Sequence, residues 1–379
     1  MKNVVIAEYC RSPFTLAYKG DLVSVRPDDL ISQVVKGLMS RSSMDPEALE
    51  DLILGCAFPE GEQGFNIARL VVFLSGLPHS IGGATVNRFC GSSMQSIHMA
   101  AGAIQMNAGE AFICAGIESM SRVPMMGFNP MPNPELYQSL PAAFASMGET
   151  AENLARQYSI SREQQELFAL ESQQKAAAAQ QAGKLSDEII PIKTSKGKTI
   201  ALDGCLRPET DAESLAGLKP AFDAAGTVTA GTSSPLTDGA SATLICSEEY
   251  ANNNGLKPLA RIKSIAISGC APEIMGIGPV ISTQKALQRA GLAMADIDII
   301  ELNEAFASQS LACIEALKID QSKVNLDGGA IALGHPLGAT GARITGKAAA
   351  LLKREDKQFA LATQCIGGGQ GIATILEAI

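Results

Sequence analysis

Two apolar hexapeptides decide the fold: Asp51-Leu52-Ile53-Leu54-Gly55-Cys56 and Asp298-Ile299-Ile300-Glu301-Leu302-Asn303. Each begins at an aspartate, continues through buried-type residues and stops at a loop, as expected for an internal strand. A helix rich in small residues is then predicted downstream of each, over 92–106 and over 337–353. The same order of elements therefore occurs twice in the chain.

Each of these helices leads into a further apolar strand, at 111–115 and at 359–365. Alternating strands and helices predict an α/β fold with mostly parallel strands, here built twice. If the two similar halves pack with equivalent loops facing each other, Cys90 and His335 come close together. Each of these residues immediately precedes one of the two helices.

The segment 122–220 differs from both halves. It contains several prolines and methionines and two polar helices, the second opening at Ser161 with a capping-box spacing to Gln164. The Ala- and Gln-rich course of that second helix to Gln181 suggests a mostly solvated helix. We interpret the segment as an inserted loop domain, and long insertions commonly carry binding function.

Composition narrows the class of protein. The 379 residues carry a net charge of −9 and are 46% hydrophobic, with 4% aromatic residues and no Trp. The chain can bury a large core, and it lacks the basic surface that nucleic-acid binding requires. The nine cysteines show no metal-ligand spacing, which favours reduced thiols, a cytoplasmic location and no bound metal. No apolar run is long enough for a membrane span.

Cys90 is the first candidate for chemistry. It lies between a predicted strand and the predicted helix, where the helix dipole favours thiolate and lowers a thiol pKa from ~8.5 to roughly 3.5–7.5. A buried structural cysteine is the alternative reading. His335 lies in a Gly-rich loop, and Pro336 favours a helix start directly after it. A capping or core role is the alternative for this histidine, while His98 and His79 are given no chemical role.

Two further loops carry polar or flexible groups. Cys365 ends a predicted strand and precedes Ile-Gly-Gly-Gly-Gln-Gly, whose N–H groups can approach a ligand closely. This loop does not follow the first strand of a βαβ unit, so an oxyanion-binding loop fits better than a dinucleotide site. Asn303 follows the second hexapeptide's strand, where it can hold a water, donate to an oxyanion or cap a helix.

Together these motifs resemble the thiolase family. The matching stretches are 86–93 (Val-Asn-Arg-Phe-Cys-Gly-Ser-Ser), 226–234 (Gly-Thr-Val-Thr-Ala-Gly-Thr-Ser-Ser), 303–306 (Asn-Glu-Ala-Phe), 328–338 and 365–371. The resemblance spans essentially the whole chain in the right order. It implies two duplicated half-folds in an α/β/α/β/α layered core plus a loop domain over coenzyme A. The expected boundaries are 1–121, completed by about 221–250, for the first half, 122–220 for the loop domain and 251–379 for the second half.

The resemblance also implies the chemistry of a 3-ketoacyl-CoA thiolase. Cys90, activated by His335, would form the acyl-enzyme, and Cys365 would exchange the α-proton. Asn303, through a water, would serve one oxyanion together with His335. The N–H groups of Cys90 and Gly367 would serve the other.

Coenzyme A is expected as a substrate rather than a bound cofactor. By resemblance Ser234 contacts its pantetheine, Arg207 lies near its adenine end, and Met147 lies beside the thioester or simply packs in the core. Short-chain biosynthetic thiolases carry His where this chain has Ser146. This difference favours the bacterial β-oxidation type over an acetyl-CoA acetyltransferase that forms acetoacetyl-CoA.

Other classes remain as alternatives. A decarboxylating ketoacyl synthase would need no thiol in the Cys365 loop. A non-catalytic acyl-CoA binding protein would need none of Cys90, His335 and Cys365. A nicotinamide dehydrogenase would bind NAD(H). The resemblance further implies a homodimer or dimer of dimers. It also suggests a larger partner subunit with hydratase and dehydrogenase activities.

Overall fold

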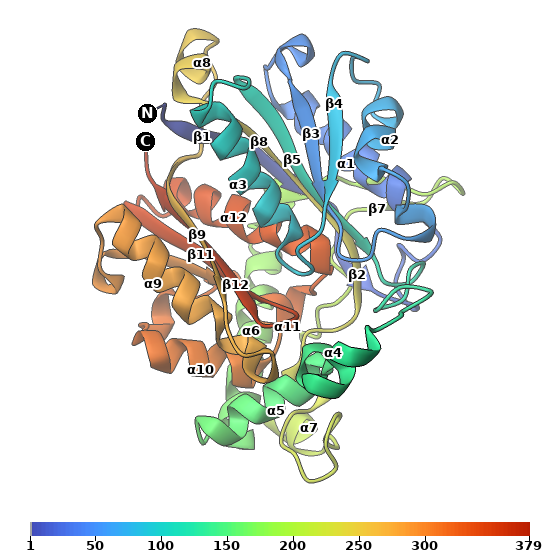
Figure 1. Ribbon diagram of the computed structural model, residues 1–379, viewed down its shortest axis with the longest axis vertical. Helices are drawn as coiled ribbons and strands as arrows, with labels where there is room; N and C mark the ends of the chain where they lie inside the picture. The colour runs from blue at the N-terminus through green and yellow to red at the C-terminus, as the bar shows by residue number, and fades with distance from the viewer. Residues whose placement is uncertain (1) are drawn as a thin grey trace.

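The computed structural model describes residues 2–379 and places a mixed sheet at the centre of the molecule (Figure 1). Within the described residues this sheet has ten strands. In spatial order they are β10 (Ile299–Leu302), β11 (Phe359–Ile366), β12 (Gln370–Glu377), β9 (Ala260–Gly269), β1 (Val4–Arg11), β8 (Thr237–Ser247), β5 (Ala111–Ser119), β3 (Asp51–Gly55) and β4 (Gly82–Val86), with β2 (Thr15–Leu16) beside β8.

The sheet consists of two halves that meet at a narrow seam. β1 of the first half pairs with β9 of the second half over only two residue pairs, Val5 with Arg261 and Ile6 with Ala260. In the first half β3 lies parallel between β4 and β5. In the second half β10 pairs in parallel with β11. On its other side Ile300 of β10 forms a parallel bridge with Val324, which takes the place that β4 has beside β3 in the first half. The duplication expected from the two hexapeptides is thus visible in the topology.

The expectation of mostly parallel strands is wrong. Only β3–β4, β3–β5 and β10–β11 are parallel, and the other pairs of the large sheet are antiparallel. The turn between β11 and β12 is too short for a crossover, so these two strands form a hairpin. Alternation of helices and strands predicted the parallel pairs but not the strands that close each half.

Helices form the remaining layers (Figure 1). The two helices predicted from the repeats, α3 (Ser92–Gln105) and α12 (Leu337–Arg354), pack against each other between the two halves. A Cβ on Gly341 of α12 would lie 2.3 Å from the backbone nitrogen of Met94, so this close approach requires glycine. The outer faces are covered by α1 (Pro27–Arg41) and α2 (Ile67–Leu74) on the first half and by α9 (Gly278–Ala290) with α10 (Ala307–Leu317) on the second. The result is the expected α/β/α/β/α order.

The segment after β5 contains α4 (Pro134–Ser139), α5 (Met147–Gln157), α6 (Arg162–Gln181), α7 (Ala212–Ala216) and the small hairpin β6 (Ile192–Lys193) and β7 (Thr199–Ile200). The short helix α8 (Glu248–Asn253) follows β8. Ser161 and Gln164 form the expected capping box of α6. The mostly solvated character expected for α6 is wrong: one face buries Phe168 and Gln173 against α10 and α11 (Ala330–Leu333). The small side chains of Ala169 and Ala176, which are buried on this face, permit the close helix contact.

Candidate active site

One cavity of about 180 Å³ brings together the three reactive side chains singled out in the sequence. Cys90, His335 and Cys365 all line it. The first lies ahead of α3, the second ahead of α12 and the third at the end of β11. The predicted meeting of Cys90 and His335 from the two halves is therefore confirmed. The rest of the wall is largely apolar, including Met120, Met125, Met147, Phe222, Phe306 and Leu337.

Cys90 sits at the end of a strained turn. Phe89, directly before it, has a φ of +42°, which a bulky aromatic residue rarely adopts. Asn87 supports this turn, because its Oδ1 accepts the Phe89 N–H at 2.8 Å. Gly91 then leads into α3, and a Cβ there would lie 2.5 Å from the side chain of Ile366. Strain of this kind, held by surrounding contacts, is common at functional sites.

The resting thiol of Cys90 is protonated, contrary to the sequence expectation. Burial raises its pKa to about 11. The backbone N–H groups of Gly367 and of Cys90 itself oppose this rise, whereas the Glu118 carboxylate adds to it. Loss of water around the sulfur thus keeps the thiol protonated, and Cys90 needs a base to become a nucleophile.

His335 is arranged as that base. Burial is the main cause that lowers its pKa to about 3, so its ring is neutral. Nδ1 lies 2.6 Å from Thr340 Oγ1, and Nε2 lies 3.4 Å from Asn303 Nδ2. An amide nitrogen only donates, so Nε2 is the acceptor and Nδ1 carries the proton toward Thr340. Thr340 Oγ1 in turn donates to Pro336 O at 3.4 Å. This tautomer leaves an unprotonated Nε2.

The backbone around His335 explains its setting. Gly334 has a φ of +102°, and a Cβ there would lie 2.7 Å from Thr237 Cγ2. The His335 N–H donates to Thr237 Oγ1 at 3.0 Å. Pro336 then stands at the N-cap position of α12. The glycine, threonine and proline together hold the imidazole at a loop-to-helix junction.

Cys365 is buried at the end of β11. Burial raises its thiol pKa well above the usual value, and the neighbouring Cys90 adds to the rise. Gly368 and Gly369 continue from it with φ values of +78° and +81°. This turn directs the Gly367 N–H to Cys90, and the space beside Gly367 is limited by the Met147 sulfur, 3.5 Å from its Cβ position.

The remaining predicted residues divide into three groups. Ser234 and Met147 line the cavity. Asn303 is fully buried behind His335, and within residues 2–379 its Oδ1 has no hydrogen-bond partner. Arg207 is exposed and does not line the cavity, although its N–H donates to Gln173 Oε1 at 2.9 Å.

The sequence reasoning missed three residues near the site. Thr340 orients His335, Gln364 donates from its amide to the carbonyl of Cys90, and Glu118 lies buried close to Cys90. Glu118 carried a readable signal, because it is the single charge in the otherwise uncharged strand β5. Thr340 and Gln364 gave no such signal, since a buried threonine or glutamine is common in helices and strands.

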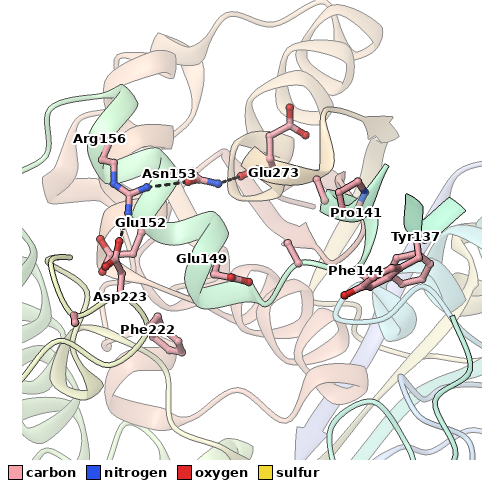
Figure 2. A pocket seen from close by; sticks show the side chains of 13 residues that line it. Tyr137, Pro141, Phe144, Glu149, Glu152, Asn153, Arg156, Phe222, Asp223 and Glu273 are labelled. Atoms are coloured by element: carbon pink, nitrogen blue, oxygen red, sulfur yellow. Dashed lines mark hydrogen bonds and ion pairs between the residues drawn. The ribbon is translucent and has the colours of Figure 1, made fainter. Parts of the chain in front are cut away.

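Phe222 also lines a larger hollow of about 690 Å³ (Figure 2). Its wall contains Glu149, Asp223 and Glu273, with Arg156 held by Asn153. None of the three reactive side chains reaches it. The smaller cavity is therefore the candidate site.

Two kinds of feature are absent from residues 2–379. No group of three or more His, Cys, Asp or Glu side chains is placed there to hold a metal ion. No described helix is long and apolar enough to cross a membrane.

A layered α/β fold whose cavity combines two thiols and a neutral imidazole defines an acyltransferase. Family models agree: residues 4–249 match "Thiolase, N-terminal domain" and residues 256–378 match "Thiolase, C-terminal domain". The chain belongs to the thiolase family.

Named relatives agree with the family models. The chain is 46% identical to the 3-ketoacyl-CoA thiolase of Bacillus subtilis and 49% identical to that of Photobacterium profundum, with all of each chain covered. Human mitochondrial 3-ketoacyl-CoA thiolase in complex with CoA matches with a TM-score of 0.92 at 40% identity, covering 100% of this chain and 98% of that one. Bacillus anthracis acetyl-CoA acetyltransferase matches with a TM-score of 0.93 at 38% identity, covering 100% and 99%.

Proposed function

We propose that this chain cleaves 3-ketoacyl-CoA with free CoA, giving acetyl-CoA and an acyl-CoA shortened by two carbons. The observation that carries the proposal is the cavity shared by Cys90, His335 and Cys365. The reaction needs a nucleophile for the keto carbon, a base to generate it and an acid for the departing carbon. The three side chains supply these roles in one place.

In the first step the Cys90 sulfur attacks the keto carbon while His335 Nε2 takes the thiol proton. Negative charge moves to the former keto oxygen. The N–H groups of Cys90 and Gly367, which already converge on the sulfur, are placed to donate to this oxyanion. Removing one donor of this kind typically costs ~10²–10³ in rate.

In the second step the bond between the α and β carbons breaks. Its electron pair becomes the enolate of acetyl-CoA, and the acyl group stays on Cys90 as a thioester. The enolate oxygen accepts from the protonated His335 Nε2 and from a water held by Asn303, whose buried Oδ1 can accept its hydrogen bond. The Cys365 thiol then donates its proton to the α carbon, and such acid catalysis contributes ~10²–10⁴-fold.

In the third step free CoA takes over the acyl group. The Cys365 thiolate removes the CoA thiol proton, and the CoA sulfur attacks the thioester on Cys90. The bond from the acyl carbon to the Cys90 sulfur then breaks, and the departing sulfur takes back the proton from His335 Nε2, which restores the neutral resting pair. Ser234 and Met147, on the wall of the cavity, contact the pantetheine and the reacting thioester. Arg207, exposed outside the cavity, meets the adenine end of CoA.

The preferred chain length is that of a β-oxidation enzyme. Ser146 lines the cavity and caps α5, accepting the Glu149 N–H at 3.3 Å while Glu149 Oε2 accepts the Ser146 N–H at 2.8 Å. A short hydroxyl occupied in this way leaves the cavity apolar and less filled than a histidine would. The alternative, an acetyl-CoA acetyltransferase, is favoured by the likeness to the Bacillus anthracis enzyme of that name.

The assembly we propose is a homodimer, or a dimer of dimers. Strand β4 is an edge strand whose five residues are only partly buried, and α2 and α3 pack beside it. Phe65, beside Asn66, whose amide bonds Gly83 O of β4, is a large apolar side chain 97% exposed at this edge. An open edge with exposed apolar residues is suited to pairing with a second copy. A hydratase/dehydrogenase partner and a cytoplasmic location complete the proposal.

Sedimentation equilibrium tests the assembly. Phe65→Asp is expected to shift the protein toward monomer, because it places a charge in the interface. Leu202→Asp, at a position 63% exposed and outside this edge, serves as the matched control. A wild-type protein that sediments only as a monomer would contradict the proposed dimer.

Thiolysis rates on acetoacetyl-CoA and on a long-chain 3-ketoacyl-CoA test the reaction itself. Cleavage of both, or faster cleavage of the long substrate, supports the β-oxidation assignment, and cleavage of acetoacetyl-CoA alone supports the acetyltransferase. Cys90→Ala should abolish labelling by radioactive acetyl-CoA. Cys365→Ala should still be labelled but fail to cleave or form the carbon–carbon bond. Normal cleavage by the Cys365 variant would remove its acid/base role.

A further inference from the structure

Glu118 is a buried carboxylate that the proposed reaction does not use. It lies next to the end of β5 and is 1% exposed. Its Oε2 accepts the N–H groups of Ala57 at 2.8 Å and Gly338 at 3.0 Å. Its Oε1 accepts the amide of Gln63 at 2.9 Å and the N–H of Phe58 at 3.3 Å. With two donors on each oxygen, the site matches an ionised carboxylate, which only accepts.

The hydrogen bonds that Glu118 accepts from Ala57 and Phe58 connect it to Cys90. The carbonyl of Ala57 accepts the Asn87 side-chain amide at 2.9 Å, and Asn87 Oδ1 accepts the Phe89 N–H at 2.8 Å. Phe89 directly precedes Cys90. The ring of Phe58 also lies 6.0 Å from the ring of Phe89, centroid to centroid. Glu118 is thus connected to the strained nucleophile turn through two hydrogen-bonded residues.

The hydrogen bond that Glu118 accepts from the Gly338 N–H connects it to His335. Gly338 belongs to the first turn of α12, three residues after His335. A Cβ at this glycine would lie 2.8 Å from Ile117 O and 2.9 Å from Glu118 Oε2, so helix and strand are in direct contact here. Glu118 therefore holds the start of the helix that carries the histidine turn. Its negative charge also interacts favourably with the positive end of the dipole of that helix.

The hydrogen bonds of Glu118 join residues of the first half to the start of α12 in the second half. Cys90 and His335 come from these different halves, and the separation between them must suit proton transfer over about 3 Å. We propose that Glu118 is a positioning residue, whose ionised carboxylate fixes the Cys90 turn relative to the His335 turn. This inference rests on the proposed role of Cys90 as nucleophile.

The charge of Glu118 gives the proposal a readout beyond stability. Cys56, whose sulfur lies 3.7 Å from Glu118 Oε1, is the titratable group that faces the carboxylate. Around Cys90 the titratable groups are His335 and Cys365 on the same cavity, together with Glu118 itself. Because Glu118 opposes the thiolate, removing its charge should shift the pH dependence of Cys90 reactivity.

Two variants separate the contact from the charge. Glu118→Asp keeps the charge but is one methylene shorter, so it cannot reach Ala57 and Gly338 together. It should lower kcat by about 10²-fold, as expected for a misplacement of about 1 Å, with the KM for CoA within about twofold of wild type. Glu118→Gln removes the charge and turns an N–H₂ group toward N–H donors. It should lower kcat similarly and also move the pH midpoint of Cys90 alkylation down by about half a unit or more.

Alkylation by iodoacetamide, mapped to the Cys90 peptide across pH 8–12, brackets the wild-type midpoint near 11. Thermal unfolding over the same pH range checks that each variant is folded. Glu152→Gln is the matched control, because Glu152 is also buried and accepts backbone N–H groups, those of Thr227 and Val228. This control should leave the midpoint unchanged. The proposal is overturned if Glu118→Asp has wild-type kcat, or if Glu118→Gln keeps the wild-type midpoint.

If Glu118→Gln does not fold, the kcat of Glu118→Asp decides alone. Failure of the proposed function is distinguishable, because it would appear as absent thiolysis by the wild-type protein. The alkylation comparison would remain interpretable in that case.

Discussion

Thr340→Val tests whether the tautomer of His335 controls catalysis. Valine has nearly the same shape as threonine, so the packing of α12 should persist while the acceptor 2.6 Å from Nδ1 disappears. The Nδ1–H group would then be buried without a partner, at a cost of about 1–3 kcal/mol. The ring can avoid this cost by moving its proton to Nε2, which removes the base that faces the cavity.

The expected consequence is a loss of about 5- to 150-fold in the rate of Cys90 acylation, which is the same free energy expressed as a rate ratio. Rapid-quench measurement of acetyl-enzyme formation from acetyl-CoA is the direct assay. Thr340→Ser keeps the hydroxyl and should stay within about twofold of wild type. Equal acylation rates for the valine and serine variants would refute the assigned tautomer.

Two further predictions concern acid stability and CoA affinity. Burial lowers the pKa values of His98 and His335 from 6.5 to about 3, so their contribution to stability is complete above pH 6.5 and is lost as the pH falls toward 3. At pH 5 each ring accounts for about 2 kcal/mol of lost unfolding free energy relative to pH 7. His98→Gln should therefore remove about half of the combined loss, measured as the difference between urea unfolding free energies at pH 7 and at pH 5. A difference equal to that of the wild-type protein would contradict this prediction. Ser234→Ala should raise the KM for CoA about 5- to 10-fold, the effect of about one hydrogen bond, whereas Ser233→Ala should not, because the Ser233 hydroxyl is already bonded to a backbone carbonyl. Equal KM values for the two variants would remove Ser234 from the CoA site.

Much of the site could be predicted because it is built from local backbone rules. Proline after His335 and glycines after Cys365 fix turns that depend on a few adjacent residues. The two hexapeptides fixed equivalent strands, and symmetry between the halves then placed Cys90 opposite His335. None of these inferences required knowledge of distant contacts.

The rest depended on tertiary contacts that no local pattern encodes. The pKa of Cys90 is set mainly by how far the fold removes water from the sulfur. The burial of α6 arises from its contact with α10 and α11. Glu118 acquires its four donors from a segment 55 to 61 residues upstream and from Gly338, 220 residues downstream. Such arrangements follow from the fold and cannot be inferred before it.

The neutral resting state of Cys90 and His335 has a consequence for the order of events. A separated thiolate and imidazolium would be strongly disfavoured in this largely apolar cavity, because both charges would lack water. Proton transfer to Nε2 must therefore accompany attack on the keto carbon, which passes the negative charge from sulfur to oxygen. The N–H groups of Cys90 and Gly367 favour negative charge at the sulfur and can donate to that oxygen as the charge moves to it. The same largely apolar cavity that suppresses the free thiolate thus makes the nucleophile reactive only when a carbonyl group is present to receive the charge.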